Sequence, residues 1–489
     1  MLYLLAVAAI GAYCSRLNRT LADFVLGGRR LGVWVTAVSA QASDMSAWLL
    51  IGLPGAAYLK GLSVVWIVIG CAAGTVFNWV IVAPRLRRAT ERGGALTVPD
   101  YLAGRYGAGR GRLVRLIAVI AILTAYATYI ASQFTAAGKT FDRVFAVVQT
   151  PWGTPAELGL GYHAGMLIGV GIILLYTTMG GFTAVAWTDL AQGMLMVVTV
   201  VVLPLAGIVT IGGPVALQEG LNGIDPALLS VTGGGADWPM FWCGVCLGGL
   251  AWGLGYPGQP HILVRFMALR DPKAMSRAAT IGIVWVLVAM TGAILLGLVG
   301  RVMFDGLDDK EKVMPALAVG LMHPAIAGAM IAGAVAAMMS TVDSQLLVAA
   351  SAVEQDVYIR LLGGRPQGRR AVWIGRITVL VLAAAALPIA WPEDKEVLAT
   401  VLDAWGVLGA ALGPAVILGL LTRRTNRWGA FVGIAVGLAV SLFWAEINWL
   451  FGGERYFTSG LAPGFVLNLI LAYTVSLLTG RGGAGANRA

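Results

Sequence analysis

The chain alternates between long apolar runs and short polar connections. Thirteen of these runs approach the roughly 20 residues that a helix needs to cross the hydrocarbon core of a bilayer. They are longer and more continuous than the alternating strands of a membrane barrel, which have about ten residues each. The predicted membrane-spanning helices cover residues 1–15, 33–59, 62–83, 114–137, 164–181, 184–212, 238–260, 278–303, 325–352, 372–390, 398–421, 428–448 and 461–479.

The first predicted helix is short, and a secretory signal peptide is the alternative interpretation. The run begins directly at Met1 and lacks the charged segment that opens a signal peptide. No convincing cleavage site of small residues follows it. We therefore expect a true membrane helix over residues 1–15.

Composition indicates an integral membrane protein. Of the 489 residues, 58% are hydrophobic and only 12% are charged, and the mean hydropathy is +0.82. A soluble domain carries roughly 25% charged residues, because it must cover its surface with polar groups. All four cysteines lie in apolar runs, so the sequence shows no disulfide framework. We therefore expect the chain to lie in a lipid bilayer.

The basic residues predict which helix ends face the cytoplasm. The chain has 34 Lys and Arg against 24 Asp and Glu, a net charge of +10. Of these 34, 26 lie in or beside the connections that follow odd-numbered helices, and only eight lie on the other side. Because cytoplasmic loops are enriched in Lys and Arg, the asymmetry predicts an external N-terminus and a cytoplasmic C-terminus. The positive charge therefore does not indicate a nucleic-acid partner.

Two of the predicted helices cannot be continuous. The second contains Val38-Ser-Ala-Gln-Ala-Ser-Asp-Met-Ser-Ala-Trp48, which places the Asp44 carboxylate and three serines at mid-membrane depth. The seventh ends in Trp252-Gly-Leu-Gly-Tyr-Pro-Gly-Gln-Pro260, where three glycines and two prolines break the helix. Irregular backbone inside a bilayer is tolerated only where it is buried in protein or lines a cavity. Both segments are therefore candidates for a binding site.

By this topology the two broken helices run in opposite directions and lie five helices apart. The arrangement predicts an inverted five-plus-five repeat, as in transporters whose broken helices bind the coupling ion and the substrate near the bilayer midplane. We expect an all-helical protein with a single membrane domain. Its predicted parts are a peripheral first helix with a cytoplasmic loop (1–32), the first repeat (33–212), the second repeat (238–421), and two peripheral helices with a short cytoplasmic tail (428–489).

The ninth helix adds two adjacent hydroxyl groups within Ala337-Met-Met-Ser-Thr-Val-Asp-Ser-Gln345. Ser340 and Thr341 can both turn toward an ion, and the Ala337 carbonyl lies one turn earlier. Hydroxyl and carbonyl oxygens suit a hard cation, and too few carboxylates converge for calcium. The alternative is that both hydroxyls bond back to their own helix and contribute only to packing.

The broken helices belong to a larger set of distinctive segments. These are Phe24-Val-Leu-Gly-Gly-Arg-Arg-Leu-Gly32, Ser43-Asp-Met-Ser-Ala-Trp-Leu-Leu-Ile-Gly-Leu-Pro-Gly-Ala56, Leu96-Thr-Val-Pro-Asp-Tyr101, Gly180-Gly-Phe-Thr-Ala-Val-Ala-Trp-Thr-Asp189, Trp252-Gly-Leu-Gly-Tyr-Pro-Gly-Gln-Pro-His-Ile-Leu-Val-Arg-Phe-Met267, Ser340-Thr-Val-Asp-Ser-Gln-Leu-Leu347 and Ala404-Trp-Gly-Val-Leu-Gly-Ala-Ala-Leu-Gly-Pro414. Together they resemble the sodium:solute symporter family, and within it the proline-transporting branch, over about residues 22–480. The resemblance implies a LeuT-type fold with thirteen helices, of which the second and seventh are broken.

The resemblance also implies a sodium site between the second and ninth helices. Asp44 matches an essential carboxylate of the family beside this site, where its charge would offset dehydration of the ion. Asp189 matches a carboxylate associated with sodium coupling; the alternative is that it anchors the end of the sixth helix at the water interface. The implied ligands are the carbonyl oxygens of Ala42, Met45 and Ala337 and the hydroxyl oxygens of Ser340 and Thr341.

For the substrate, the resemblance implies aromatic walls around a pyrrolidine ring. Such a ring fits against flat aromatic faces, and its secondary ammonium favours a π face. Taken one at a time, these aromatics have core packing as the alternative. The backbone amides freed at the breaks, or the Ser46 hydroxyl, could receive the carboxylate. Gln133 departs from the family, which usually has a small residue four positions after Tyr129. The implied substrate-binding residues are Ser46, Trp48, Tyr129, Trp252, Tyr256 and Pro260.

We therefore expect a sodium-coupled secondary active symporter that imports L-proline across the bacterial cytoplasmic (inner) membrane. No phosphate loop or nucleophile motif suggests an enzyme, and we expect neither an obligate protein partner nor nucleic acid. One alternative is a sodium symporter for another amino acid, a monocarboxylate or pantothenate. The other is a solute sensor that binds without transporting. A channel fits less well, because paired broken helices suit alternating access.

Overall fold

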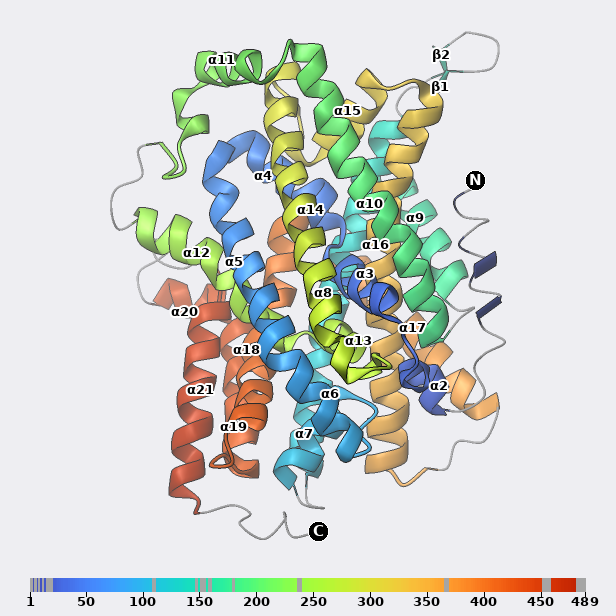
Figure 1. Cartoon of the computed structure of the whole chain (residues 1–489), viewed down its shortest axis with the longest axis vertical. Helices are drawn as coiled ribbons and strands as arrows, with labels where there is room; N and C mark the ends of the chain where they lie inside the picture. The colour runs from blue at the N-terminus through green and yellow to red at the C-terminus, as the bar shows by residue number, and fades with distance from the viewer. Residues whose placement is uncertain are drawn as a thin grey trace.

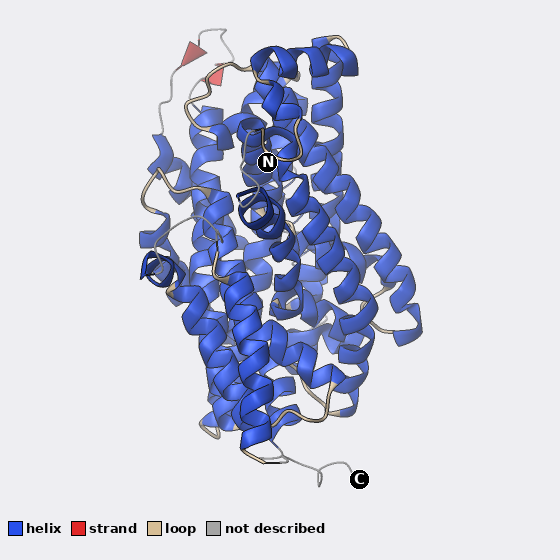
Figure 2. Cartoon of the chain, turned by 90° about the vertical axis from the view of Figure 1, so that its left-hand side faces the viewer, coloured by secondary structure: helices blue, strands red, loops and turns tan. Residues whose placement is uncertain are grey.

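Runs of Leu, Ile, Val, Ala and Gly form the helices of this molecule, because every backbone amide in lipid must be bonded within the protein. The computed structural model describes residues 21–107, 111–145, 161–177, 181–234, 240–364, 369–450 and 459–480. It also describes two short strands between residues 145 and 161, and six of the first fourteen residues. Figure 2 shows that nearly all of this part of the chain is helical. The two strands, β1 (Val148–Gln149) and β2 (Pro155–Ala156), form one small antiparallel pair at the upper end of Figure 1.

The helices follow one another with short connections, and η marks a 3-10 or π-helical segment. The first half contains α2 (Leu21–Leu26), η1 (Gly27–Arg29), α3 (Val33–Asp44), η2 (Trp48–Gly52), α4 (Leu53–Lys60), η3 (Gly61–Val64), α5 (Val65–Phe77), η4 (Asn78–Val82), α6 (Ala83–Arg92), α7 (Val98–Gly107), α8 (Arg112–Phe145), α9 (Gly161–Thr177), α10 (Phe182–Ile211), α11 (Pro214–Ile224) and η5 (Pro226–Leu229). The second half contains η6 (Met240–Leu247), α12 (Gly248–Ala251), η7 (Trp252–Gly258), α13 (Pro260–Ala268), η8 (Pro272–Ala274), α14 (Met275–Met303), η9 (Lys310–Lys312), α15 (Val313–Leu321), α16 (Pro324–Ser351), η10 (Ala352–Leu361), α17 (Arg369–Ala390), α18 (Val397–Leu421), α19 (Arg427–Leu442), α20 (Trp444–Leu450) and α21 (Leu461–Leu478).

The second to thirteenth predicted spans each overlap described helices. The first predicted span, 1–15, lies mostly outside the described residues. By length and composition, eight of the described helices could cross a membrane, or nine if the bent pair α19 and α20 forms one span. The number is lower than predicted because the seventh span is divided into short helices, the second continues into the third, and α9 has only a short apolar stretch. The count of thirteen therefore stays a prediction.

The second and seventh spans are both interrupted, as predicted. α3 ends at Asp44, and Met45 leaves helical geometry at φ −82° and ψ 72° before η2 begins at Trp48. The seventh span tightens into η7 and becomes extended at Gln259, where φ is −94° and ψ is 100°. Pro260 then opens α13, since proline is tolerated in the first turn of a helix. In Figure 1, α4 continues from α3 toward the upper end and α13 continues from α12 toward the lower end, so the two broken spans run in opposite directions.

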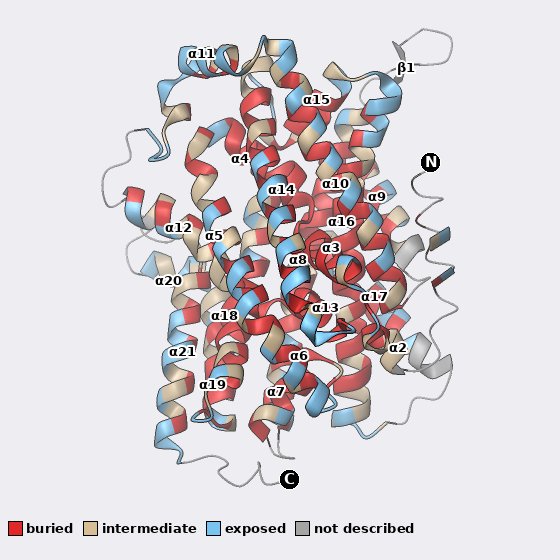
Figure 3. Ribbon diagram, viewed as in Figure 1, coloured by how far each residue is buried: buried red, intermediate tan, exposed pale blue. Residues whose placement is uncertain are grey.

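The interrupted seventh span packs between α5 and α18. Glycine makes this close approach possible: a Cβ on Gly74 of α5 would lie 2.6 Å from the Tyr256 ring. A Cβ on Gly255 would lie 1.8 Å from the ring nitrogen of Trp405 on α18. Small residues at such contacts are typical of membrane proteins, where helices associate by packing. Figure 3 shows that buried residues are concentrated around α3, α10 and α16 in the middle of the bundle.

Candidate ion- and substrate-binding site

Oxygen atoms from α3 and α16 meet where α3 ends. Ser340 donates a hydrogen bond to the Ala42 carbonyl at 2.8 Å, and its hydroxyl also lies 3.2 Å from the Ala337 carbonyl. Thr341 donates to the Ser43 carbonyl at 3.1 Å. All of these residues are fully buried. Both hydroxyls therefore bond across to α3, and Ser340 also bonds back to its own helix at Ala337.

The atoms gathered here suit a hard monovalent cation. The last carbonyls of a helix have no partner within it, so those of Ala42 and Ser43 are available to α16 or to an ion. Met45, the remaining implied ligand, is buried at the first non-helical position after α3. Among the described residues, no three His, Cys, Asp or Glu side chains gather as metal ligands. Neutral carbonyl and hydroxyl oxygens fit sodium better than a transition metal.

Asp44 contributes its backbone and its side chain to different surroundings. Its carbonyl oxygen accepts hydrogen bonds from Trp48 Nε1 at 3.1 Å and from the Tyr129 hydroxyl at 3.5 Å. Its carboxylate is fully buried, and neither carboxylate oxygen has a hydrogen-bond partner among the described residues. An unpaired carboxylate at this depth is costly, so Asp44 stays a candidate site residue.

The predicted aromatic walls meet around the two breaks. The rings of Trp48 and Trp252 lie 4.9 Å apart between centroids, at an angle of 39°. Tyr129 reaches the same place from α8 through its bond to Asp44, and Pro260 is buried at the start of α13. Trp48, Tyr129, Trp252 and Tyr256 are each at most 1% exposed. A substrate can therefore reach these rings only after the surrounding helices move.

Trp405 on α18 also belongs to this cluster, although the sequence did not indicate it. It is fully buried, and its ring lies 6.2 Å from that of Trp252 and 4.9 Å from that of Tyr256. Its Nε1 donates to the Trp252 carbonyl at 3.0 Å. The segment around it carries the family resemblance, but nothing in the local pattern indicates that this tryptophan supports the seventh span.

Gln133 closes the break in the second span from the side of α8. Its Oε1 accepts the hydrogen bond of the Ala47 backbone amide at 3.0 Å, and its Nε2 donates to the Ser46 hydroxyl at 3.2 Å. These are the groups that we expected to receive a substrate carboxylate. The side chain that departs from the family pattern therefore contacts the expected carboxylate site directly.

Asp189 lies within a buried ion pair. Its carboxylate accepts hydrogen bonds from Arg265 at 3.0 Å, from Ser39 at 2.7 Å and from Ser43 at 3.1 Å. Arg265 also bonds to Ser344, and both charged side chains are fully buried. The alternative that Asp189 anchors a helix end at the water interface is therefore wrong. Arg265 was not expected in this place, because its position in the sequence is that of a basic residue beside a cytoplasmic connection.

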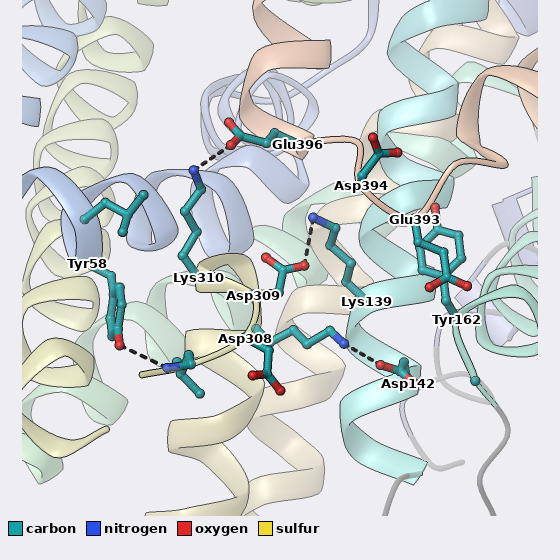
Figure 4. Close-up of a pocket in the computed structure, with 14 residues that line it drawn as sticks. Tyr58, Lys139, Asp142, Tyr162, Asp308, Asp309, Lys310, Glu393, Asp394 and Glu396 are labelled. Atoms are coloured by element: carbon teal, nitrogen blue, oxygen red, sulfur yellow. Dashed lines mark hydrogen bonds and ion pairs between the residues drawn. The ribbon is translucent and has the colours of Figure 1, made fainter. Parts of the chain in front are cut away.

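A cavity of about 690 Å³ opens near the upper end of the bundle (Figure 4). Charged side chains line it, and several pair across it: Lys139 with Asp309 at 2.9 Å, Lys310 with Glu396 at 2.5 Å, and Lys312 with Asp142 at 2.5 Å. The buried Glu311 pairs with the same Lys139 at 2.7 Å. These pairs join α8, η9 and the start of α18, so they hold the upper end together in this conformation. The residues that line this cavity include none of the aromatic cluster.

Comparison with known proteins identifies the family. Residues 24–437 match the sodium:solute symporter family. The chain belongs to that family. Among other members, the high-affinity proline transporter PutP of Bacillus subtilis is 38% identical over 475 residues, which cover 96% of this chain and 95% of that protein. The sodium/proline symporter of Escherichia coli is 35% identical, over 97% of this chain and 91% of that protein.

Solved structures confirm the predicted fold class. A Na+-coupled sialic acid symporter in a substrate-bound outward-open state matches with a TM-score of 0.78 at 19% identity, over 98% of this chain and 97% of that one. Mhp1, a transporter of the nucleobase-cation-symport-1 family, matches in a closed conformation with a TM-score of 0.55 at 16% identity, over 94% of each chain. At these identities the similarity concerns the fold alone. This symporter family member is a multi-pass membrane protein with the LeuT-type inverted repeat and broken second and seventh helices.

Proposed function

We propose that this chain imports L-proline together with sodium. The observation that carries the proposal is the meeting of the α16 hydroxyls with the last carbonyls of α3, directly beside aromatic side chains at the two breaks. An ion and an organic solute bound at one break can bias the same conformational change, which is the requirement for coupling. The names of the relatives in Bacillus subtilis and Escherichia coli support proline as the solute.

In this proposal sodium binds between α3 and α16. Asp44 and Asp189 influence the ion through their charges, since both carboxylates are buried close to the end of α3. Sodium binding would replace the hydrogen bonds of Ser340 and Thr341 with ion contacts and so fix α16 against α3. The proposed ligands are the carbonyl oxygens of Ala42, Met45 and Ala337 and the hydroxyl oxygens of Ser340 and Thr341.

Proline binds between the aromatic side chains of the second, fourth and seventh spans. Its ring would separate Trp48 from Trp252, which pack on each other in this conformation. Its carboxylate would take the Ala47 amide in place of Gln133, with Ser46 as a second donor. The proposed substrate-binding residues are Ser46, Trp48, Tyr129, Trp252, Tyr256 and Pro260.

We further infer that the protein lies in the bacterial cytoplasmic membrane with its C-terminus inside. Exposed arginines on α6 and the basic connections beyond α13 and α18 lie toward the lower end of Figure 1, which supports that end as cytoplasmic. The boundaries 1–32, 33–212, 238–421 and 428–489 belong to the same proposal.

Uptake of radiolabelled proline into proteoliposomes tests the proposed function. An inward sodium gradient should drive accumulation above the level reached with an equal potassium gradient. A panel of unlabelled amino acids, monocarboxylates and pantothenate should compete poorly with proline. If sodium drives uptake of another member of the panel and not of proline, the symporter stands and the proline assignment fails.

A further inference from the structure

A set of buried polar atoms without partners surrounds the Asp44 carboxylate. Both carboxylate oxygens, the Thr75 hydroxyl on α5 and the Tyr256 hydroxyl on η7 have no hydrogen-bond partner among the described residues. Asp44 is fully buried, and Thr75 and Tyr256 are each 1% exposed. Buried polar groups are nearly always paired, so several unpaired oxygens in one place need an explanation.

The three side chains come from different spans and are held in place by their surroundings. The Tyr256 hydroxyl lies close enough to the Asp44 carboxylate and to the Thr75 hydroxyl to interact with both, although no hydrogen bond of good geometry joins them. The Tyr256 ring packs against Gly74, the residue before Thr75, and the Asn78 side chain donates to the Tyr256 carbonyl at 3.2 Å. The second, third and seventh spans therefore present one carboxylate and two hydroxyls to the same place.

Simple packing does not explain Thr75. A threonine inside a membrane helix normally bonds back to a carbonyl three or four residues earlier, which satisfies its hydroxyl. Thr135, Thr188 and Thr199 all do so here, at 3.2 Å, 3.0 Å and 3.0 Å. Thr75 makes no such bond. Its hydroxyl is therefore not held by its own helix and lies beside the Tyr256 hydroxyl instead.

We propose that Asp44, Thr75 and Tyr256 together receive the ammonium group of the transported amino acid. This inference rests on the proposed function and adds the orientation of the substrate at the break. A secondary ammonium is cationic and has two N–H donors, which one carboxylate and two neutral hydroxyls can accept. Charge-assisted bonds of this kind are the strong ones, and a buried carboxylate needs a cation as its partner.

The position of the cluster favours the substrate ammonium over the sodium ion. The Asp44 carboxylate lies beside the Tyr256 side chain, which packs against Trp405, so it belongs to the aromatic cluster. The oxygens expected to bind sodium are instead paired with each other between α3 and α16. The Ala47 amide, three residues after Asp44, is available for the other end of a zwitterion once Gln133 is displaced.

The test compares proline with tetrahydrofuran-2-carboxylate, in which a ring oxygen replaces the ammonium nitrogen. Equilibrium binding of labelled proline to the purified full-length protein at saturating sodium gives the affinity for proline. Competition by unlabelled tetrahydrofuran-2-carboxylate gives the affinity for the analogue. Binding of ²²Na+ without proline provides a separate readout of the ion site. The variants are Thr75→Val and Tyr256→Phe, which remove one oxygen and keep the shape of the side chain. Matched controls are Thr135→Val and Tyr106→Phe, whose hydroxyls are buried but bond to backbone carbonyls.

We expect each test variant to weaken proline binding about tenfold or more, because it loses a hydrogen bond to a charged group. Binding of the oxygen analogue and of sodium alone should change by less than about twofold, so the preference for proline falls. The controls should keep that preference. An unchanged preference in both variants overturns the inference, and so does an equal loss of sodium binding, which would assign the cluster to an ion. If the wild-type protein binds another solute and no proline, proline is not the substrate and the proposed function also fails. If the wild-type protein binds proline but both variants keep the preference, only the ammonium site fails.

Discussion

Single hydroxyl and carbonyl groups define the ion site at the residue scale. Ser340 and Thr341 are adjacent in sequence, and each reaches a different carbonyl of the last turn of α3. The two bonds join residues 298 positions apart. The proposed coupling depends on these two polar contacts, which join distant parts of the chain inside the bilayer.

Replacing both hydroxyls tests this site. In Ser340→Ala/Thr341→Ala, two of five proposed ligand oxygens are lost while the helix keeps its backbone bonds. We expect the sodium concentration for half-maximal proline uptake to rise about tenfold or more, since each lost bond to a charged group costs roughly 1.5 kcal/mol or more. Thr199→Val on α10 is the control, because its hydroxyl bonds only to its own helix. A double variant with normal sodium dependence and normal expression would exclude this pair as ligands.

Gln133 allows a second residue-scale prediction. Gln133→Leu removes the acceptor of the buried Ala47 amide, and an unsatisfied buried amide costs about 1–3 kcal/mol. We expect a lower melting temperature in detergent without substrate. Gln192→Leu is the control, because the Gln192 side chain donates only to the Tyr3 hydroxyl and supports no broken helix. Equal melting temperatures for the two variants would show that Gln133 does not stabilise the break.

The buried pair of Asp189 and Arg265 connects elements. Asp189 lies on α10, Arg265 on α13, and their bonds to Ser39, Ser43 and Ser344 extend to α3 and α16. Four helices around the ion site therefore share one ion pair. Removing one partner leaves an uncompensated buried charge, whereas replacing both removes the charge altogether.

A double-mutant cycle measures this connection. Asp189→Leu and Arg265→Leu should each destabilise the protein by about 3–5 kcal/mol, and the double variant should recover much of that loss. Thermal unfolding in detergent gives the comparison. The half-exposed pair of Lys310 and Glu396 serves as the control, since an exposed pair contributes about 1 kcal/mol or less. Additive losses for Asp189 and Arg265 would mean that the two side chains act independently.

The same elements show how far the sequence could be interpreted. Apolar length predicted the described spans, a carboxylate among serines predicted the second break, and glycine and proline content predicted the seventh, because these properties are local along the chain. The convergence of Ser340, Thr341 and the α3 carbonyls also followed, through the resemblance. The burial of Arg265 did not follow, because its partner Asp189 is 76 residues away and the two meet only because α10 and α13 both pack on α3. Trp405 was missed for the same reason, since its contacts with the seventh span depend on the approach of α18 at Gly255.

At the scale of the whole molecule, transport requires the upper end to open. The aromatic side chains at the breaks are buried, and charged pairs link α8, η9 and α18 above them. Closure of a site by helices that must later separate is the basis of alternating access. The structure therefore represents one closed arrangement of a cycle.

Cross-linking this end tests the required opening. In a background without the native cysteines, Lys312→Cys and Asp142→Cys replace side chains that form a 2.5 Å ion pair between η9 and α8. A short bis-methanethiosulfonate, which links the two thiols through disulfides, should abolish proline uptake by the double variant, and a reductant should restore it. Each single variant, treated in the same way, should keep its activity. Uptake at the untreated rate after complete cross-linking would show that these helices need not separate.

Coupling of two fluxes through one site is the central claim, and reversal of the driving force tests it most directly. Proteoliposomes with equal sodium on both sides and clamped membrane potential receive an inward proline gradient. We predict that ²²Na+ accumulates transiently inside, because each substrate shifts the same conformational equilibrium and the coupling is reciprocal. The Ser340→Ala/Thr341→Ala variant should show little accumulation at the same sodium concentration. Proline entry at the wild-type rate without any net movement of ²²Na+ would contradict the account.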